Sequence, residues 1–372
     1  MIYADNAATT QLDKEALEAM IPFLTKEYGN ASQPYSFAIT EKKALKNARK
    51  IIAECINADP DEIYFTSGGT ESDNWAIKMG CRVKGGRVVI SEIEHHAILH
   101  ACNAIDKDGF EVKYLPVDET GVVKLKEAKS IIDKNTGLVS VMMANNEIGS
   151  IQPINELAQF AHENGAIFHT DAVQAVGHIP VDVKAMNVDL LSASAHKFNG
   201  PKGIGFLYIK KGIDIKPYMD GGAQEKGLRA GTENVASIVG MAIALKKNNS
   251  RLNELRLMMS RFEHVLVNEL KRGNIDFIIN GNINKIPGNI SISFRNMEGE
   301  MILHRLDLKG ICVSTGSACD SVNTQVSHVL KAIKISELYA IGTIRISLGY
   351  NDTEDDVVEI GKQIINIVNA QL

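Results

Sequence analysis

The feature that most constrains the fold of this sequence is a succession of short apolar runs, separated by segments with helical spacing, between about residues 62 and 210. Several runs are apolar throughout, which is typical of strands that are covered on both faces. Strands that alternate with helices predict an α/β domain around a mostly parallel sheet. The expected strands are 63–66, 87–91, 112–116, 138–143, 167–171, 189–193 and 204–209.

Helical spacing of apolar residues flanks this region on both sides. It predicts a helix whose apolar face runs from Leu12 to Leu24, a second helix over residues 36–57 and a long helix over residues 252–271. Near the C-terminus, Thr353 precedes three acidic residues. This pattern predicts that Thr353 is the N-cap of a last helix.

The chain has 372 residues, which is more than one hydrophobic core usually organises. We therefore predict a large domain and a smaller α+β domain. The large domain is expected over residues 12–250, and the small one is expected to combine residues 1–11 with residues 251–372. The strands of the small domain are expected near 289–294 and 343–348.

Charge and composition exclude several classes of partner. The 40 basic and 45 acidic residues give a formal net charge of −5 without any dense basic run, so we expect no direct binding of nucleic acid. No stretch approaches the roughly 18 apolar residues of a membrane span, and the first ten residues do not resemble a signal peptide. The five cysteines include no Cys-x-x-Cys pair. We therefore expect no association with membranes and a cytoplasmic location.

Two residues with chemical potential follow successive expected strands. Lys197 lies just after the strand at 189–193, and a partly desolvated lysine can form a Schiff base. Asp171 ends the preceding strand, and a carboxylate there can bind a protonated pyridine nitrogen. Taken singly, Lys197 is more simply a solvated loop residue and Asp171 a helix N-cap. Because both lie at carboxyl ends of strands, the pair predicts a shared ligand.

Other polar groups near these positions could bind the phosphate and the ring of such a ligand. The glycine-rich turn at residues 66–74 stands between a strand and a helix, where backbone N–H groups can bind an anion. An ordinary strand-to-helix turn is the commoner explanation of that pattern. Ser194 and His196 could donate to the same phosphate, and Gln174 could donate to a phenolic oxygen.

The run Glu94-His95-His96 follows the strand at 87–91. An imidazole can stack on an aromatic cofactor and transfer protons near neutral pH. A zinc site formed by His95, His96 and His100 is the alternative. Their spacing does not present all three side chains on one helical face.

A single cysteine, Cys319, stands among small residues in the run Ser314-Thr315-Gly316-Ser317-Ala318-Cys319-Asp320-Ser321. Small neighbours suit an accessible nucleophile. A structural cysteine in the core is the usual alternative.

As an ordered set, these motifs resemble those of the cysteine desulfurases, the NifS/IscS-like group of the class V aminotransferase family. The resemblance runs from the motif at residues 3–10 to the motif at 345–349. It implies a fold type I pyridoxal-phosphate (PLP) enzyme that forms a homodimer. It also implies conversion of L-cysteine to L-alanine, with transfer of the sulfur to an enzyme persulfide. The implied acceptor is an iron–sulfur scaffold or a tRNA-thiolation protein.

The resemblance further implies roles for individual residues. Lys197 would bind the cofactor covalently, His95 would stack over the ring and move protons, and Cys319 would carry the persulfide. Asn146 and Arg345 would bind the substrate carboxylate. The residues implied to hold the cofactor are Gly69, Thr70, Asp171, Gln174, Ser194, His196, Lys197 and, from the other subunit, Thr232.

Alternative functions remain open at this point. They are a selenocysteine lyase, another class V PLP enzyme, or a non-catalytic sulfur-relay scaffold, which the absence of Lys197 or Asp171 would favour. The sequence departs from the family pattern at residues 325–326 and 340–343, positions that bear on subgroup and acceptor. No resident metal is implied, although Cys319 could be a transient ligand of an iron–sulfur cluster.

Overall fold

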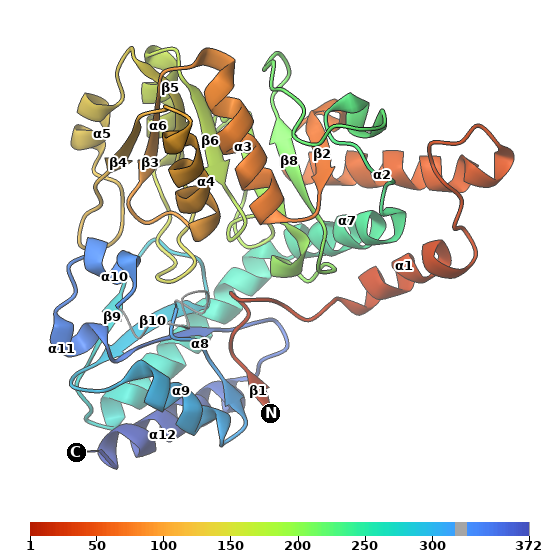
Figure 1. The fold of residues 1–372 in the computed structure, drawn as a ribbon. Helices are drawn as coiled ribbons and strands as arrows, with labels where there is room; N and C mark the ends of the chain where they lie inside the picture. Colours follow the sequence, from red (N-terminus) through yellow and green to blue (C-terminus); the bar gives the residue numbers. More distant parts are fainter. Residues whose placement is uncertain (317–325, 372) are drawn as a thin grey trace.

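The centre of the computed structural model, which describes residues 1–316 and 326–371, is a seven-stranded sheet (Figure 1). Its strand order is β2-β8-β7-β6-β5-β3-β4, and only β8 runs antiparallel to its neighbours. The predicted α/β architecture with a mostly parallel sheet is confirmed. The strands are β2 Ile63–Thr66, β3 Arg87–Ser91, β4 Val112–Leu115, β5 Thr136–Ser140, β6 Ile167–Asp171, β7 Leu190–Ser194 and β8 Gly205–Ile209.

Helices cover both faces of this sheet, as the unalternating apolar runs require. On one face, α3 and α4 pack against side chains such as Leu138 and Leu190. On the other face, α2, α5, α6 and α7 pack against the alternate positions of the same strands, such as Val139 and Leu191. The bounds are α1 Lys14–Thr25, α2 Ile39–Cys55, α3 Gly69–Lys84, α4 His96–Lys107, α5 Leu125–Ile131, α6 Ile154–Glu163 and α7 Val235–Ser250.

A second, smaller lobe is built on the three-stranded antiparallel sheet β12-β10-β9. The N-terminal strand β1 pairs with β11 on this lobe, so the predicted packing of the N-terminus there is confirmed. Thr353 caps α12 in a reciprocal capping box with Asp356, also as predicted. The elements are β1 Ile2–Tyr3, α8 Leu252–Arg272, β9 Phe277–Asn280, β10 Asn289–Phe294, α9 Gly299–Asp307, β11 Ile311–Cys312, α10 His328–Ala332, α11 Glu337–Ala340, β12 Thr343–Ser347 and α12 Glu354–Asn369.

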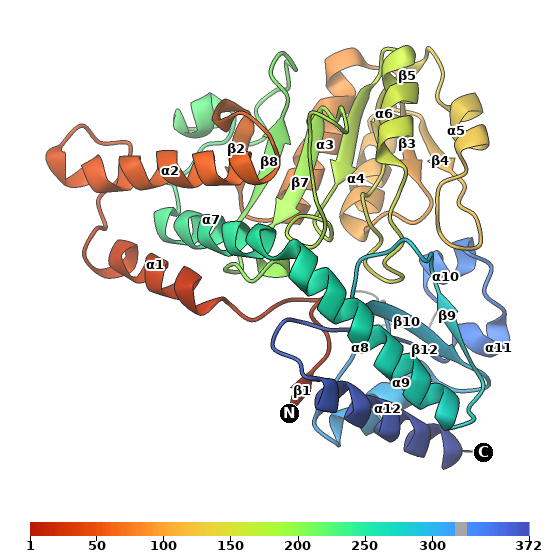
Figure 2. The ribbon, with the colours of Figure 1, turned by 180° about the vertical axis from the view of Figure 1, so that it is seen from behind.

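Two hydrophobic cores fill the large lobe, one on each face of its sheet, and a third fills the small lobe. Helices α7 and α8 follow one another along the back of both lobes (Figure 2). The division into residues 12–250 against 1–11 plus 251–372 stays a prediction. Within residues 1–316 and 326–371, none of the helices combines the length and the apolar composition that a bilayer span requires.

Several predicted boundaries were wrong. Helix α2 begins at Ile39, after the 3₁₀ turn Ser36–Ala38, and not at residue 36. The expected strand at 138–143 is β5, which begins at Thr136 and ends at Ser140. Helix α7 was not predicted at all. Ten of its residues are buried, and they lie on more than one side of the helix, so its sequence lacks the one-sided apolar spacing of a surface helix.

The start of β8 lies against the glycine-rich turn that joins β2 to α3. A Cβ atom on Gly205 would lie 2.4 Å from the carbonyl oxygen of Ala193 and 2.8 Å from the Cα of Gly68. Both obstacles are backbone atoms, so no side-chain rotation can relieve the clash. The absence of a side chain at Gly205 therefore allows the turn to sit directly over the sheet.

We expect Gly205→Ala to lower the free energy of unfolding by about 1–3 kcal/mol, because the added methyl group forces the backbone apart. Urea unfolding followed by circular dichroism measures this change. The matched control is Gly80→Ala in α3, where the new Cβ would meet Leu190 at an ordinary 3.4 Å. That control should be neutral or stabilising by up to about 1 kcal/mol. Equal losses in the two variants would contradict the close-approach argument.

Candidate active site

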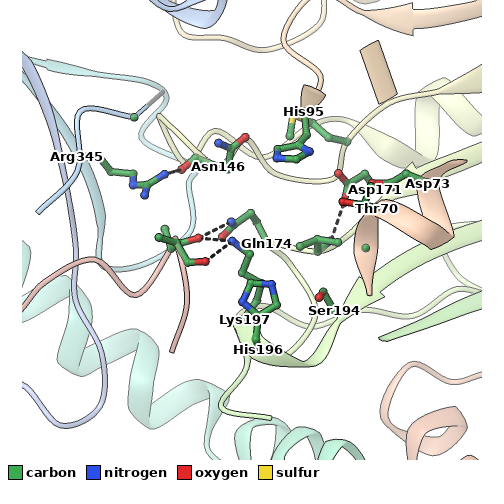
Figure 3. Close-up of a pocket in the computed structure, with 16 residues that line it drawn as sticks. Thr70, Asp73, His95, Asn146, Asp171, Gln174, Ser194, His196, Lys197 and Arg345 are labelled. Carbon is green, nitrogen blue, oxygen red and sulfur yellow. Dashed lines mark hydrogen bonds between the residues drawn. The ribbon is translucent and has the colours of Figure 1, made fainter. Parts of the chain in front are cut away.

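A cavity of about 300 Å³ opens where the parallel strands end, between the large sheet and the N-terminal segment. Figure 3 shows Arg345 and Asn146 toward one end of this cavity, Asp171 toward the other, and Lys197 between them. The structure thus brings together nearly all of the predicted site residues. The predicted residues that line the cavity are Gly69, Thr70, His95, Asn146, Asp171, Gln174, Ser194, His196, Lys197 and Arg345.

Asp171 and Lys197 reach the cavity from the adjacent parallel strands β6 and β7. Asp171 is the last residue of β6, and Lys197 follows the end of β7 at the same edge of the sheet. The Nζ atom of Lys197 donates to the carbonyl oxygens of Ala7 at 2.6 Å and Ala8 at 2.9 Å. These contacts hold the amine at the cavity wall, so the alternative of a solvated loop lysine is wrong.

Asp171 is 5% exposed, and its Oδ1 accepts the backbone N–H of Val173 at 2.9 Å. No helix starts at Asp171, so the N-cap alternative is wrong. Burial raises the pKa of Asp171 to about 6, against the opposing effects of that N–H group and of the Lys197 charge. The side chain is therefore mainly a carboxylate at neutral pH.

The glycine-rich turn leads directly into α3, so the first backbone N–H groups of that helix stand where the sequence predicts that a phosphate binds. Gly69 is the first residue of that helix, and a Cβ atom there would lie 2.6 Å from Cγ2 of Val173. Only glycine lets the helix end come this close to the turn after β6. Nearby, burial and then the Lys197 charge lower the pKa of His196 to about 4, so His196 offers a hydrogen bond without a charge.

His95 is the N-cap of α4, and its Nδ1 accepts the backbone N–H of Ala97 at 3.1 Å. Burial, followed by the Lys197 charge, lowers the pKa of His95 to about 4. The ring is consequently neutral near pH 7, with its hydrogen on Nε2. In the described part of the chain, no group of three His, Cys, Asp or Glu side chains is arranged to bind a metal ion.

Arg345, on β12, is 3% exposed and is held by two partners from distant parts of the chain. Its Nη2 lies 2.7 Å from Oδ1 of Asp5, and its Nη1 donates to the carbonyl oxygen of Asn146 at 3.0 Å. The buried Nε has no hydrogen-bond partner among the described residues. A guanidinium with one unsatisfied buried donor is suited to an incoming carboxylate.

Gln174 donates to the carbonyl oxygen of Ala7 at 3.0 Å, beside the amine of Lys197. The cavity therefore brings together a helix N-terminus, a carboxylate, an amine and an arginine. These groups suit an aromatic aldehyde with a phosphate arm and a basic ring nitrogen, together with an amino acid near the arginine. The residues present are compatible with PLP.

Two predicted residues are not brought into this cavity. Thr232 is exposed and does not line it. Cys319 lies outside the described residues, whereas Gly316, three positions earlier, lines the cavity. The sequence reasoning also missed Asp73, which lines the cavity from α3. Its position four residues after Gly69, one helical turn, is the signal that could have identified it.

Comparisons with known proteins agree with this geometry. The family model described as Aminotransferase class-V matches residues 2–360. The cysteine desulfurase IscS of Methanosarcina thermophila is 46% identical over 370 residues, which are 99% of this chain and 92% of that protein.

Two solved structures are also similar. A NifS-like protein has a TM-score of 0.93 at 39% identity and covers 99% of both chains. SspA in complex with cysteine has a TM-score of 0.83 at 34% identity, covering 94% of this chain and 99% of that one. The chain therefore belongs to the class V aminotransferase family of PLP enzymes, within the group that includes the IscS cysteine desulfurases.

Proposed function

We propose that this chain is a cysteine desulfurase that converts L-cysteine to L-alanine and takes the sulfur onto Cys319 as a persulfide. The observation that carries the proposal is that Lys197, Asp171 and Arg345 line one cavity. A relative named cysteine desulfurase over nearly the whole length supports the activity, and a similar structure solved with cysteine supports the substrate.

When bound, PLP accepts the electron pair that remains on the substrate Cα after a proton is removed. Asp171 would bind the ring nitrogen, because a buried carboxylate favours the protonated, cationic form of a nearby nitrogen. Gln174 would donate to the phenolic oxygen. The residues proposed to hold the phosphate are Gly69, Thr70, Ser194 and His196.

Lys197 would bind the cofactor and later act as the base at the substrate Cα. Its Nζ already stands at the cavity wall between two carbonyl oxygens, so the released amine has a defined position from which to accept that proton. His95 is neutral and would stack over the ring. Its Nε2 hydrogen faces away from the cap contact and is available for transfer.

Arg345 and Asn146 would bind the substrate carboxylate. Asp5 and the backbone of Asn146 fix the two terminal nitrogens of the arginine, and the unpaired Nε needs an acceptor. A substrate carboxylate in the cavity would meet the charge of this guanidinium, since Arg345 is one of the lining residues. The charge of Arg345 is therefore available at a defined orientation before substrate binds.

Cys319 would be the nucleophile. Ser314 exchanges two backbone hydrogen bonds with Arg345, and Gly316 lines the cavity. On the other side, Nε2 of His328 lies 3.0 Å from the carbonyl oxygen of Glu94, next to His95. Both described flanks of residues 317–325 thus adjoin the site. The Cys319 thiolate would attack the substrate sulfur, the C–S bond would break toward carbon, and protonation would give alanine.

The sulfur would then pass to an acceptor such as an iron–sulfur scaffold or a tRNA-thiolation protein, in the cytoplasm. The name IscS of the relatives supports the first acceptor class. A transient role of Cys319 as an iron–sulfur ligand remains a prediction.

We also propose that the chain acts as a homodimer. Helices α1 and α2 form an arm that projects from the large lobe (Figure 1). Apolar side chains exposed on this arm support a buried interface, since monomers rarely expose such a patch. They are Leu17, Ile21, Leu24, Tyr28, Tyr35, Phe37 and Ile39. Thr232, which does not line the cavity of its own chain, would reach the phosphate of the partner's cofactor.

The activity is tested by incubating the protein with L-cysteine. We expect alanine to form and one sulfur atom to be added to the peptide that contains Cys319, as seen by mass spectrometry. Cys319→Ala should retain PLP but lose sulfur transfer, whereas Lys197→Ala should lose covalent cofactor binding. Cys312→Ala is the matched control and should behave as the parent protein does. Unchanged turnover of cysteine by Cys319→Ala would refute the proposal.

The dimer is tested by mixing two inactive variants, Lys197→Ala and Thr232→Ala. If Thr232 serves the partner's site, each mixed dimer contains one intact site and one doubly altered site. We therefore expect mixed dimers to regain tight PLP binding at about one site per dimer, measured by absorbance after subunit exchange. If Thr232 served its own chain, every site in the mixture would remain damaged and no recovery would appear.

A further inference from the structure

Asp73 is an acidic residue on the floor of the cavity to which no role has been assigned. It lies one turn into α3, is 1% exposed, and lines the same cavity as Asp171. Figure 3 shows Asp73 and Asp171 next to each other at the far end from Arg345. A second buried carboxyl group at this position must affect the charge that the cofactor meets.

The surroundings of Asp73 contain no compensating cation among the described residues that contact it. Its Oδ1 is buried without a hydrogen-bond partner in the described part of the chain. The Ser192 hydroxyl is the polar group that opposes the effect of burial on the pKa of Asp73. A basic side chain, His169, lies close to Asp73, with its Nε2 3.9 Å from that Oδ1.

His169 does not neutralise Asp73. Its Nδ1 lies 2.8 Å from the hydroxyl of Ser140, and its Nε2 lies 3.0 Å from the hydroxyl of Ser192. Burial alone lowers the pKa of His169 to about 3, so the ring is uncharged at neutral pH. The other facing groups are two carboxyls, Asp171 on β6 and Glu94 before α4.

Two carboxyl groups that share a buried site cannot both ionise at low cost, so one of them retains a proton. Asp171 has the better support for a charge, since it accepts the N–H of Val173 and faces Lys197. Asp73 has only the Ser192 hydroxyl, and burial together with Asp171 raises its pKa well above the usual range. Burial also raises the pKa of Glu94 to about 8, which leaves Glu94 largely protonated at pH 7.

We propose that Asp73 is a positioning residue that is protonated at neutral pH and thereby leaves the negative charge of the pair on Asp171. Its role is exerted through Asp171, which meets the cofactor ring. This inference rests on the proposed contact between Asp171 and the ring nitrogen, and the experiments below distinguish a failure of one from a failure of the other.

The first experiment measures PLP affinity by equilibrium titration. Asp73→Asn replaces a neutral acid with a neutral amide of similar shape, so the Kd should stay within about threefold of the parent value. A threefold change is smaller than the change expected from the loss of one hydrogen bond. Asp171→Asn removes the charge and should raise the Kd at least about tenfold. An equal loss of PLP affinity in both variants would overturn the role proposed for Asp73 and would leave the role of Asp171 standing. No weakening in either would instead refute the proposed contact of Asp171.

The second experiment follows urea unfolding of the cofactor-free protein as a function of pH. An acid whose pKa is higher in the folded state holds a proton that the unfolded chain releases, so its contribution to stability falls as pH rises above about 4. The folding equilibrium constant of the parent should therefore fall by up to about tenfold more per pH unit than that of Asp73→Asn. Asp106→Asn, on the exposed side of α4, is the matched control and should keep the parent slope.

If Asp73→Asn had the parent slope, Asp73 would be ionised and the proposal would be wrong. Should that variant fail to fold, infrared spectroscopy of the Glu94→Gln protein provides the same decision. A protonated carboxyl band at pH 7 is expected in that protein, and it should persist when Asp171→Asn is added, which leaves Asp73 as its source. The absence of any such band would overturn the proposal.

Discussion

The structure of the site depends on holding an ionised carboxylate, Asp171, out of water. Burial opposes that charge, while the N–H of Val173 and the ammonium of Lys197 favour it. Both supports come from the same edge of the sheet, where β6 and β7 pair in parallel and place Asp171 opposite Ser192. The register of these two strands thus fixes where the Asp171 carboxylate, the Lys197 amine and the Ser192 hydroxyl lie relative to one another.

Much of this arrangement could be predicted from the sequence because it follows from where strands end. Asp171, Lys197 and Gly69 each adjoin an apolar run, and parallel strands collect such residues at one edge. Asp73 could not be assigned in that way, since its place in the site arises from the packing of α3 across β5, β6 and β7. The four-residue spacing from Gly69 indicates that Asp73 lies on the same face of α3 as Gly69, but it does not indicate which side chains of the sheet Asp73 contacts.

The contacts between segments that lie far apart in the chain could not be predicted from the sequence either. Ala7 and Ala8 contact the amine of Lys197 through their backbone oxygens, and Ala7 is 190 residues away in the chain. A contact with backbone atoms leaves no pattern of side chains from which it could be predicted. The contact of Asp5 with Arg345 also depends on tertiary structure. It forms because β1 pairs with β11 and brings the N-terminus to β12. Sequence patterns report local periodicity, whereas these contacts depend on how the two lobes meet.

Charge balance gives a reason why the protons should be distributed as proposed. Lys197 offsets Asp171, and Arg345 offsets Asp5, while His95 and His196 are neutral. The phosphate of the proposed cofactor would lie at the start of α3, only one helical turn from Asp73. If Asp73 were also ionised, it would repel that phosphate across a poorly solvated cavity. A protonated Asp73 confines the negative charge to Asp171 and leaves the helix end free to attract the anion.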